Sequence, residues 1–352
     1  MRPAAVLANA AGFQVSSVDL FADIDTQEHS LASYRSQNYP YDTFSIAKST
    51  NAPCWMYTGC MENCPDLVAE LATTKQLLGN DKKAIELCRS SEYLHEVAAT
   101  GTWNYPDEYC SLADHCSMWI SKPQASAAGH DIKVSAEKPL EDPNRIIQPF
   151  ITGPTYGAVC VSNGTDCRLL GVTRQLRLKH ALGAGRFEYS GSVGSVAFPE
   201  KIQTVIAEMA QQVSHACGLF GLFGLDFKVL REDVWLLEVN PRFTASMELV
   251  QTETNLIQLH INACNKKSIE VRIGSAGSQC FTARGILYAK QDCSYITHGD
   301  NRKHMADIPE CGTTFDVGQP VCSVYGSAST IIGAVKTMMQ RARLVRSELK
   351  IR

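Results

Sequence analysis

Three polar residues lie within two apolar segments near the middle of the chain, where a packed interior would normally exclude them. The segment 224–240, GLDFKVLREDVWLLEVN, holds Asp226 in its first apolar run and Glu238 and Asn240 in its second. A three-residue turn over 231–233 places Asp226 directly opposite Glu238. Opposed carboxylates have Cβ atoms about 5 Å apart and repel each other unless a cation lies between them. The pattern therefore favours a divalent metal site.

The register of this hairpin also separates a polar face from an apolar one. Mg2+ prefers hard oxygen ligands, usually one or two carboxylates with water and phosphate oxygens. Asn240, two residues beyond Glu238, adds an amide oxygen on the polar face, which Lys228 would share. A solvated hairpin face is the alternative, and a two-residue turn would send the two acids to opposite faces. The apolar face would consist of Phe227, Val229, Trp235, Leu237 and Val239.

Length and composition favour a globular protein that acts on small molecules. With 352 residues and 45% hydrophobic composition, the chain can bury the cores of two or three compact units. A net charge of -3 without long basic runs argues against a surface for nucleic acid or anionic membranes. No apolar run approaches the roughly 18 residues of a membrane span. We therefore expect small-molecule chemistry in the cytoplasm.

The cysteines and the first residues carry less information about function. Fourteen cysteines are scattered without the paired CxxC spacing of structural zinc sites, which fits reduced thiols in a cytoplasmic protein. Cys60 and Cys64, in GCMENC, are interpreted as small packed residues, with a redox or metal site as the alternative. The opening run MRPAAVLANAAGF is short and weakly hydrophobic, so it indicates a helix that ends at Gly12 and not a signal peptide.

Element patterns divide the chain into three units of α/β and α+β class. Residues 1–107 alternate strands and helices as in a parallel sheet, but open with a helix where such a fold normally opens with a strand. Residues 108–274 are rich in strands and contain the clearest helix, 199–218, with apolar residues at helical spacing. The following GLFGLFG, 218–224, indicates close packing. Residues 275–352 read as strands and turns before a terminal helix.

Several motifs together resemble the ATP-grasp superfamily. These are LDF…LLEVNPR, an upstream ISKP followed by a small-residue loop, and IQPFITG between them, over roughly residues 110–250. Within the superfamily, WMYTGCMENCPDL, LLGND, GVTRQL and EVNPRFTASMEL resemble a group of ATP-dependent carboxylate-amine ligases related to biotin carboxylase. That group is often associated with tetrahydromethanopterin-linked one-carbon metabolism. The resemblance implies an ATP-grasp fold, an N-terminal Rossmann-like domain and a small β-rich closing domain. Because the chain opens with a helix, we expect either that the sheet of the N-terminal domain is one strand smaller than usual or that the piece supplying its first strand is missing from this chain.

The resemblance also implies a nucleotide site. Lys122 would contact ATP phosphates, and the loop 124–129, QASAAG, would close over them through backbone N–H groups, although the family usually has more glycines there. Thr155 stands where the family carries an acid that faces the ribose. The hinge that receives adenine would consist of Gln148, in place of the usual glutamate, Pro149, Phe150 and Ile151.

The family pattern assigns Mg2+ coordination to Asp226, Glu238 and Asn240, in agreement with the hairpin register, and Mn2+ is an acceptable substitute. Arg242 would stabilise the transferring phosphoryl group or anchor a substrate carboxylate, and Arg174 in GVTRQL is a second candidate. The segment TASMEL would line the acceptor pocket or begin a helix with a capping box. Its polar residues are Thr244, Ser246 and Glu248.

These assignments imply a ligase that activates a carboxylate as an acylphosphate with Mg-ATP and joins it to an amine, releasing ADP and phosphate. The expected partners are small-molecule acids and amines, with neither nucleic acid nor membrane, and a homodimer is a further expectation. Alternatives on the same fold are a kinase, a bicarbonate-using carboxylase, and a nucleotide-binding protein without turnover.

Overall fold

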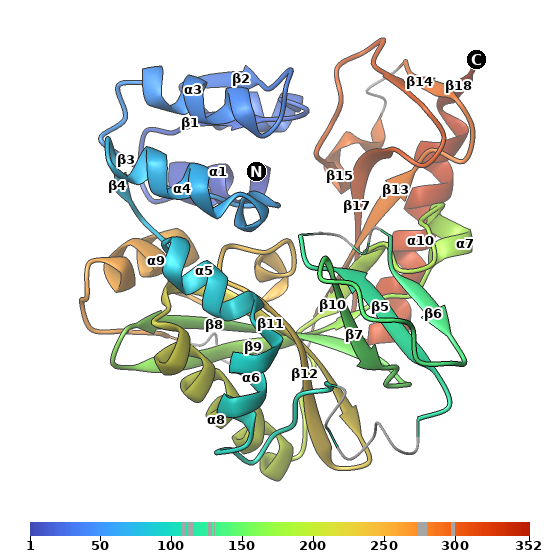
Figure 1. Ribbon diagram of the computed structural model, residues 1–352. Helices are drawn as coiled ribbons and strands as arrows, with labels where there is room; N and C mark the ends of the chain where they lie inside the picture. Colours follow the sequence, from blue (N-terminus) through green and yellow to red (C-terminus); the bar gives the residue numbers. More distant parts are fainter. Residues whose placement is uncertain (108–109, 111–115, 126–128, 130, 273–279, 297–299) are drawn as a thin grey trace.

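The computed structural model describes residues 1–107, 110, 116–125, 129, 131–272, 280–296 and 300–352. Figure 1 shows three groups of elements: the N-terminal elements in blue at the upper left, the central sheet and its helices below, and the C-terminal elements in red at the upper right.

The N-terminal elements alternate helices with two short pairs of parallel strands. The first helix, α1 (Arg2–Ala10), has proline in its first turn and is followed by Gly12 at φ 84°, as the sequence predicts. The strands are β1 (Ser16–Asp19) with β2 (Ala32–Arg35), and β3 (Cys54–Trp55) with β4 (Gln76–Leu77). The helices are α2 (Ile24–Glu28), α3 (Tyr41–Ser49), the 3-10 turn η1 (Met61–Asn63) and α4 (Pro65–Ala72).

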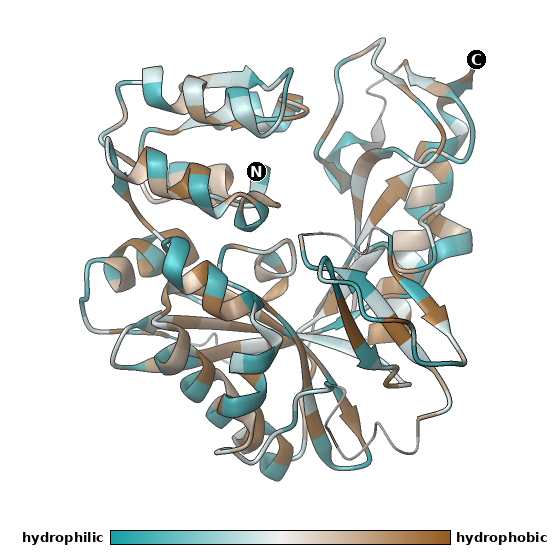
Figure 2. Ribbon diagram, in the orientation of Figure 1, coloured by the Kyte–Doolittle hydropathy of each residue, from teal (hydrophilic) through white to brown (hydrophobic). Residues whose placement is uncertain are grey.

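An eight-stranded sheet, in which every neighbouring pair is antiparallel, forms the centre of the molecule. Its strands near the middle are largely hydrophobic in Figure 2. Strands from the C-terminal segment continue this sheet, so that segment is joined to the centre by backbone hydrogen bonds. In spatial order the strands are β12 (Asp233–Asn240), β11 (Phe220–Leu230), β8 (Thr155–Asn163), β9 (Cys167–Gln175), β10 (Gly191–Gly194), β13 (Phe281–Tyr288), β17 (Pro320–Ala328) and β15 (Met305–Ala306).

Helices cover this sheet with apolar faces. The helix α8 (Glu200–Cys217) confirms the prediction for 199–218, with Gly218 as its left-handed cap at φ 65°. The helices α5 (Lys82–Arg89) and α6 (Ser91–Ala98) contribute Ala84 and Leu94 to the same core cluster as α8. The predicted single helix over 82–99 is therefore two helices. The helix α5 also contributes Ile85 to the core cluster of the N-terminal elements, together with Val68 and Leu71 of α4, so it packs against both groups of elements.

The remaining elements lie around this centre. A separate three-stranded antiparallel sheet has β5 in the middle, between β6 and β7, and a second small sheet has β14 between β16 and β18. The bounds of the first sheet are β5 (Trp119–Pro123), β6 (Lys133–Ser135) and β7 (Arg145–Pro149). Those of the second are β14 (Cys293–Tyr295), β16 (Thr314–Phe315) and β18 (Leu349–Ile351). The other helices are α7 (Lys179–Leu182), α9 (Leu256–Cys264), α10 (Ile331–Ser347), η3 (Met247–Leu249) and η4 (Asp300–His304).

The β11–β12 hairpin reaches the predicted pairing by a different route. Leu230 pairs with Asp233, so the turn has two residues, and the prediction of a three-residue turn was wrong. A bulge then leaves Leu237 as an extra residue in β12, which restores the register and pairs Asp226 with Glu238. The apolar face changes accordingly, because Trp235 and Leu237 do not join the core cluster. Its residues are Phe227, Val234, Leu236 and Val239, with Val229 packed against it.

A buried histidine connects α9 to two distant segments. The amide of Leu222 in β11 donates to Nδ1 of His260 over 2.8 Å, and Nε2 of His260 lies 3.0 Å from the carbonyl oxygen of Leu78. At Gly221, φ is 73° and an added Cβ would lie 2.4 Å from His260 Nδ1, so the backbone approaches the ring as only glycine allows. The glycines of 218–224 therefore serve the helix cap and close packing, as the sequence indicates.

This histidine predicts an acid-sensitive fold. Burial lowers the pKa of His260 to about 4, so this imidazole is protonated at a lower pH in the folded protein than in the unfolded chain. Stability from this group is complete above the unfolded pKa near 6.5 and falls by about 2 kcal/mol between pH 7.5 and pH 5. Urea unfolding at both pH values checks this in wild type and His260→Gln. The variant should lack this part of the pH dependence, and identical pH profiles would contradict the prediction.

Candidate active site

The two acids of the hairpin lie side by side where β11 and β12 pair. Asp226 also pairs with Gly157 in β8, and an added Cβ on that glycine would lie 3.5 Å from Asp226 Oδ1. Burial raises the pKa of Asp226 to about 7, and the nearby charge of Glu238 adds to the rise. Two carboxylates, joined by the amide oxygen of Asn240 at the end of β12, form a hard-oxygen donor set that suits Mg2+. The residues present thus fit a divalent cation.

The raised pKa predicts how the affinity for a divalent cation depends on pH. A cation must displace the proton that Asp226 carries below about pH 7, so its apparent affinity should rise about tenfold from pH 6 to pH 8. Titration with Mn2+ followed by electron paramagnetic resonance measures this. Asp226→Asn should bind Mn2+ more weakly and with little pH dependence, and the same slope in both proteins would argue against the assignment.

Lys122 joins the small sheet to the acidic hairpin. It lies in β5, and its Nζ donates to the carbonyl oxygen of Leu237, the bulged residue of β12, over 3.0 Å. Burial lowers the pKa of this ammonium group, while Glu238 and Asp226 act in the opposite direction. The structure therefore brings Lys122 together with the predicted metal ligands. Of the predicted loop 124–129, residues 126–128 lie outside the described residues.

The predicted hinge leads from β7 towards the central sheet. Gln148 is 3% exposed, its side chain lies beside the Tyr105 hydroxyl, and its Nε2 makes no hydrogen bond of normal geometry among the described residues. The amide of Phe150 donates to the carbonyl oxygen of Met118 over 2.9 Å, and Ile151 is buried. Thr155 begins β8, next to the hinge. Gln148 thus presents a buried polar group that a ligand in this hinge could satisfy.

Lys228 of β11 contacts the hinge, and the sequence had suggested no role for it in the site. Its Nζ donates to the carbonyl oxygens of Ile151 and of Gly153, the latter over 3.2 Å, and lies 5.2 Å from the ring centroid of Phe150. Burial lowers the pKa of Lys228 to about 8, and the charge of Arg177 contributes. Its position on the polar face of the hairpin, opposite Thr155 in β8, was the signal that could have revealed it.

Arg242 lies against Asn240, and a residue of the N-terminal elements also holds it. Its Nη2 donates to Asn240 Oδ1 over 3.1 Å, and both Nε and Nη2 lie 2.7 Å from Glu62 Oε1. Glu62 belongs to η1, and Arg89 of α5 approaches the same oxygen at 3.7 Å. The sequence gave no indication of this contact, because 180 positions separate Glu62 from Arg242.

Arg174 is not brought to the acids. It is exposed and pairs with Tyr156, whose ring stacks on Phe227 of the core, whereas the neighbouring Thr173 pairs with Gly157 beside Asp226. Because side chains alternate along a strand, Arg174 lies on the face opposite to the acids. The next residue, Gln175, instead supplies a side-chain hydrogen bond to Asp226.

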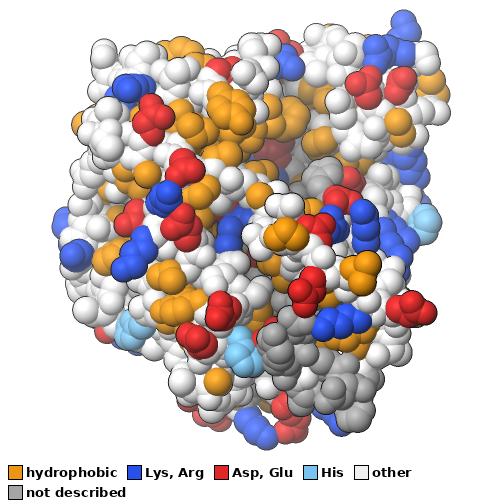
Figure 3. All heavy atoms as spheres, in the orientation of Figure 1, with side chains coloured by type: hydrophobic (Ala, Val, Ile, Leu, Met, Phe, Trp, Pro, Cys, Tyr) orange, Lys and Arg blue, Asp and Glu red, His pale blue; other side chains and the backbone are white. Residues whose placement is uncertain are grey.

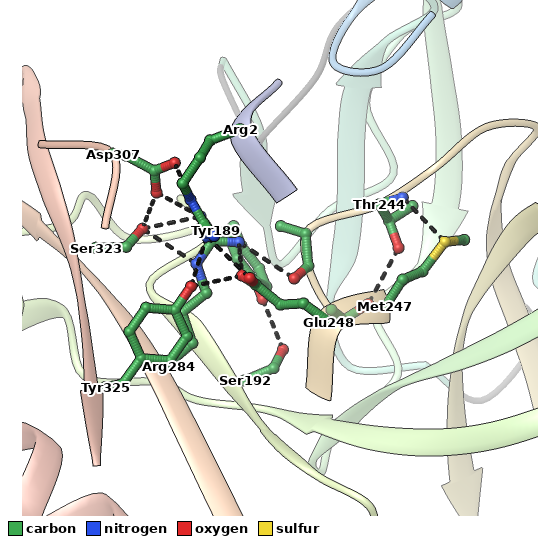
Figure 4. A network of polar contacts seen from close by, with 12 residues as sticks. Arg2, Tyr189, Ser192, Thr244, Met247, Glu248, Arg284, Asp307, Ser323 and Tyr325 are labelled. Carbon is green, nitrogen blue, oxygen red and sulfur yellow. Dashed lines mark hydrogen bonds and ion pairs between the residues drawn. The ribbon is translucent and has the colours of Figure 1, made fainter. Parts of the chain in front are cut away.

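A second polar cluster lies beside the site and connects all parts of the chain (Figure 4). Arg2 of α1 and Arg284 of β13 both bind Glu248 of η3, at 2.8 and 3.0 Å, and both also bind Asp307. Tyr325 donates to Glu248 over 2.8 Å. The predicted acceptor residue Glu248 therefore pairs with two arginines, while Thr244 and Ser246 lie 3.1 Å apart through their hydroxyl oxygens.

The cysteines near Glu62 show no sign of activation. Burial raises the pKa of both Cys60 and Cys64, and the charge of Glu62 raises it further, so both thiols stay protonated. Over the described ranges, every cysteine is free of disulfide bonds, and no group of three or more His, Cys, Asp or Glu side chains is arranged to hold a metal. These findings favour the interpretation of packed thiols.

Figure 3 shows acidic and basic side chains intermixed on one face, with a hollow between the N-terminal and C-terminal elements. Among the described helices, none is both long and apolar enough to cross a membrane.

Comparison with known proteins identifies the family of the central domain. Residues 94–246 match the model of the ATP-grasp domain family. The whole chain superposes on biotin carboxylase from Campylobacter jejuni, solved as a β,γ-ATP complex, with a TM-score of 0.72 and 13% identity over 98% of this chain and 88% of that one. It also superposes on the biotin carboxylase domain of Hydrogenobacter thermophilus 2-oxoglutarate carboxylase, solved with MgADP and bicarbonate, with a TM-score of 0.71 and 11% identity over 99% of this chain and 88% of that one. Residues 94–246 thus match the ATP-grasp domain family, and the superpositions confirm the predicted fold.

Curated relatives match over shorter stretches. The tyramine–L-glutamate ligase of Methanocaldococcus jannaschii is 26% identical over 136 residues, which cover 38% of this chain and 41% of that protein. The chain spans less than half the length of each of the curated relatives that it matches.

Proposed function

We propose that this protein is an ATP-dependent carboxylate-amine ligase that forms ADP. The observation that carries the proposal is the cross-strand pair of Asp226 and Glu238, flanked by Lys122 and Arg242. Two acids for a divalent cation, between two cations that can bind phosphate, form an arrangement suited to phosphoryl transfer. The similarity to a tyramine–L-glutamate ligase supports a carboxylate and an amine as the substrates.

The proposed reaction has two steps. A carboxylate oxygen of the acid attacks the γ-phosphorus of ATP, ADP leaves, and an acylphosphate forms. The amine nitrogen then attacks the acyl carbon, phosphate leaves, and the nitrogen gives up a proton to form the amide. No protein nucleophile takes part, so catalysis consists of positioning and charge stabilisation.

The proposal gives each part of the site a role. Lys122 would hold the phosphates, and the hinge from Gln148 to Ile151 would hold the adenine, with Lys228 fixing the hinge carbonyls. Asp226, Glu238 and Asn240 would hold Mg2+, which when bound neutralises phosphate charge. Arg242 would stabilise the charge of the transferring phosphoryl group. The solved neighbours with ATP and with MgADP support these ligands.

Location and assembly are proposed from the cysteines and from a solved neighbour. Fourteen cysteines without a disulfide bond fit a reducing compartment, for which we propose the cytoplasm. The solved biotin carboxylase domain of Hydrogenobacter thermophilus is a dimer, and a homodimer is proposed for this chain by that similarity alone. The surface of mixed charge fits small-molecule substrates.

The test is ADP release from Mg-ATP in the presence of hydroxylamine and pooled carboxylates. Hydroxylamine traps an acylphosphate whatever the natural amine is, so we expect carboxylate-dependent ADP together with a hydroxamate. A stable phosphorylated product without hydroxamate would instead establish a kinase. Dependence of ADP release on bicarbonate would indicate a carboxylase, and ATP binding without turnover would indicate a binding protein.

A further inference from the structure

Arg242 lies within range of the acidic pair, yet its guanidinium group is bound to Glu62. Both Nε and Nη2 of Arg242 lie 2.7 Å from Glu62 Oε1, and Nη2 also contacts Asn240. The side chains of Arg242 and Glu62 are 12% and 2% exposed. A buried ion pair of this geometry fixes the direction of the guanidinium group, because planar arginine loses little freedom for each hydrogen bond that it makes.

Glu62 is held between two arginines that come from different elements. It lies in η1, between β3 and α4, while Arg89 of α5 reaches the same carboxylate oxygen and also donates through Nη1 to the carbonyl oxygen of Gln124 over 2.6 Å. The other oxygen of Glu62, Oε2, is buried and has no hydrogen-bond partner among the described residues. Two guanidinium groups therefore offset the cost of burying this carboxylate group.

Without Glu62, the charge of Arg242 would act directly on the metal ligands. Arg242 already lies close enough to influence Asp226, and Glu238 in turn influences Arg242. A buried guanidinium group that loses its carboxylate partner is strongly destabilised. A conformation in which it pairs with another acid is then favoured. Asn240, which Arg242 contacts, lies two residues beyond Glu238 in β12, so an arginine that turned towards that acid would compete with a divalent cation for its oxygens.

We propose that Glu62 is a positioning residue that holds Arg242 against Asn240 and keeps its guanidinium group off the carboxylates of the cation site. This inference deepens the proposed function and rests on its assignment of the cation to Asp226 and Glu238. It also gives the N-terminal elements a part in the site, because Glu62 lies outside the matched family region of 94–246.

The test is a double-mutant cycle on Mn2+ affinity, which requires no turnover. Electron paramagnetic resonance of free Mn2+ gives the dissociation constant of wild type, Glu62→Gln, Arg242→Gln and the double variant. We expect Glu62→Gln to weaken Mn2+ binding about tenfold, as loss of an outer-shell partner commonly does. In the Arg242→Gln background the same change should weaken binding by no more than about twofold, because the competing cation is gone.

A matched control is Glu70→Gln, which removes an exposed acid from α4 in the same group of elements and should leave Mn2+ affinity unchanged. Glu62→Asp keeps the charge on a shorter side chain, so it should bind Mn2+ more tightly than Glu62→Gln and provides a second variant if Glu62→Gln does not fold. Equal weakening in both backgrounds would overturn the inference, since Glu62 would then act without Arg242. So would unchanged Mn2+ affinity in Glu62→Gln.

The cycle separates this inference from the proposed function. If wild type binds Mn2+ and shows the expected coupling but gives no carboxylate-dependent ADP, the ligase proposal fails and the role of Glu62 stands. If ADP and hydroxamate form but the coupling is absent, the ligase proposal stands and the role of Glu62 fails.

Discussion

Replacing Glu238 by glutamine is expected to lower carboxylate-dependent ADP release by on the order of 100-fold or more. Glutamine has the same size as glutamate but lacks the charge. The donor set therefore keeps the carboxylate of Asp226 and loses that of Glu238. Weak cation binding then leaves the phosphate charge without its main counter-charge. Initial rates of ADP formation at saturating Mg-ATP, with hydroxylamine and the pooled acids, measure the effect.

The hairpin itself offers the control for this experiment. Glu232 lies in the turn of the same hairpin, its side chain is 70% exposed, and it pairs only with the exposed Lys201 among the described ion pairs. Glu232→Gln should therefore keep turnover close to that of wild type, because exposed pairs contribute little. Near-normal turnover in Glu238→Gln would show that the acidic pair is not the centre of the reaction.

Replacing Arg284 by methionine is expected to cost about 3–5 kcal/mol of the free energy of unfolding, the usual penalty for breaking a buried ion pair. Arg284 is 6% exposed at its side chain and binds Glu248 at 3.0 Å and Asp307 at 2.8 Å. Burial opposes the charge of Asp307, yet Arg284 and Arg2 hold the pKa of that carboxyl well below its usual range. The variant leaves two partly buried acids with Arg2 as their remaining arginine.

Urea unfolding at pH 7, followed by circular dichroism, measures this loss. Arg343→Met is the matched control, because Arg343 lies exposed on α10 in the same part of the chain. Its change should stay within about 0.5 kcal/mol, as is usual for surface positions. Equal and small losses in both variants would show that the cluster of Figure 4 does not hold the N-terminal and C-terminal elements together.

Local patterns in the sequence predicted several elements and the strand pairing on which the proposed metal ligands depend. The 3.6-residue periodicity and glycine cap of α8 appear directly in the chain, because both arise from contacts within one helix. The pairing of Asp226 with Glu238 was also predictable, since strand alternation and a short turn restrict the register. The predicted turn length was nevertheless wrong. The pairing is present because the bulge at Leu237 adds to β12 the one residue that the shorter turn lacks.

Contacts between distant segments were decided only by the tertiary structure. Glu62 reaches Arg242 across 180 positions, and Arg2 reaches Asp307 across 305. No periodicity in the sequence encodes such a contact, because the direction of each side chain depends on how separate elements pack. The same applies to Arg174, which its motif suggested for catalysis but which the sheet directs away from the acids. The sequence therefore determined which chemistry the site can hold, and the packing of the three groups of elements decided which charges surround it.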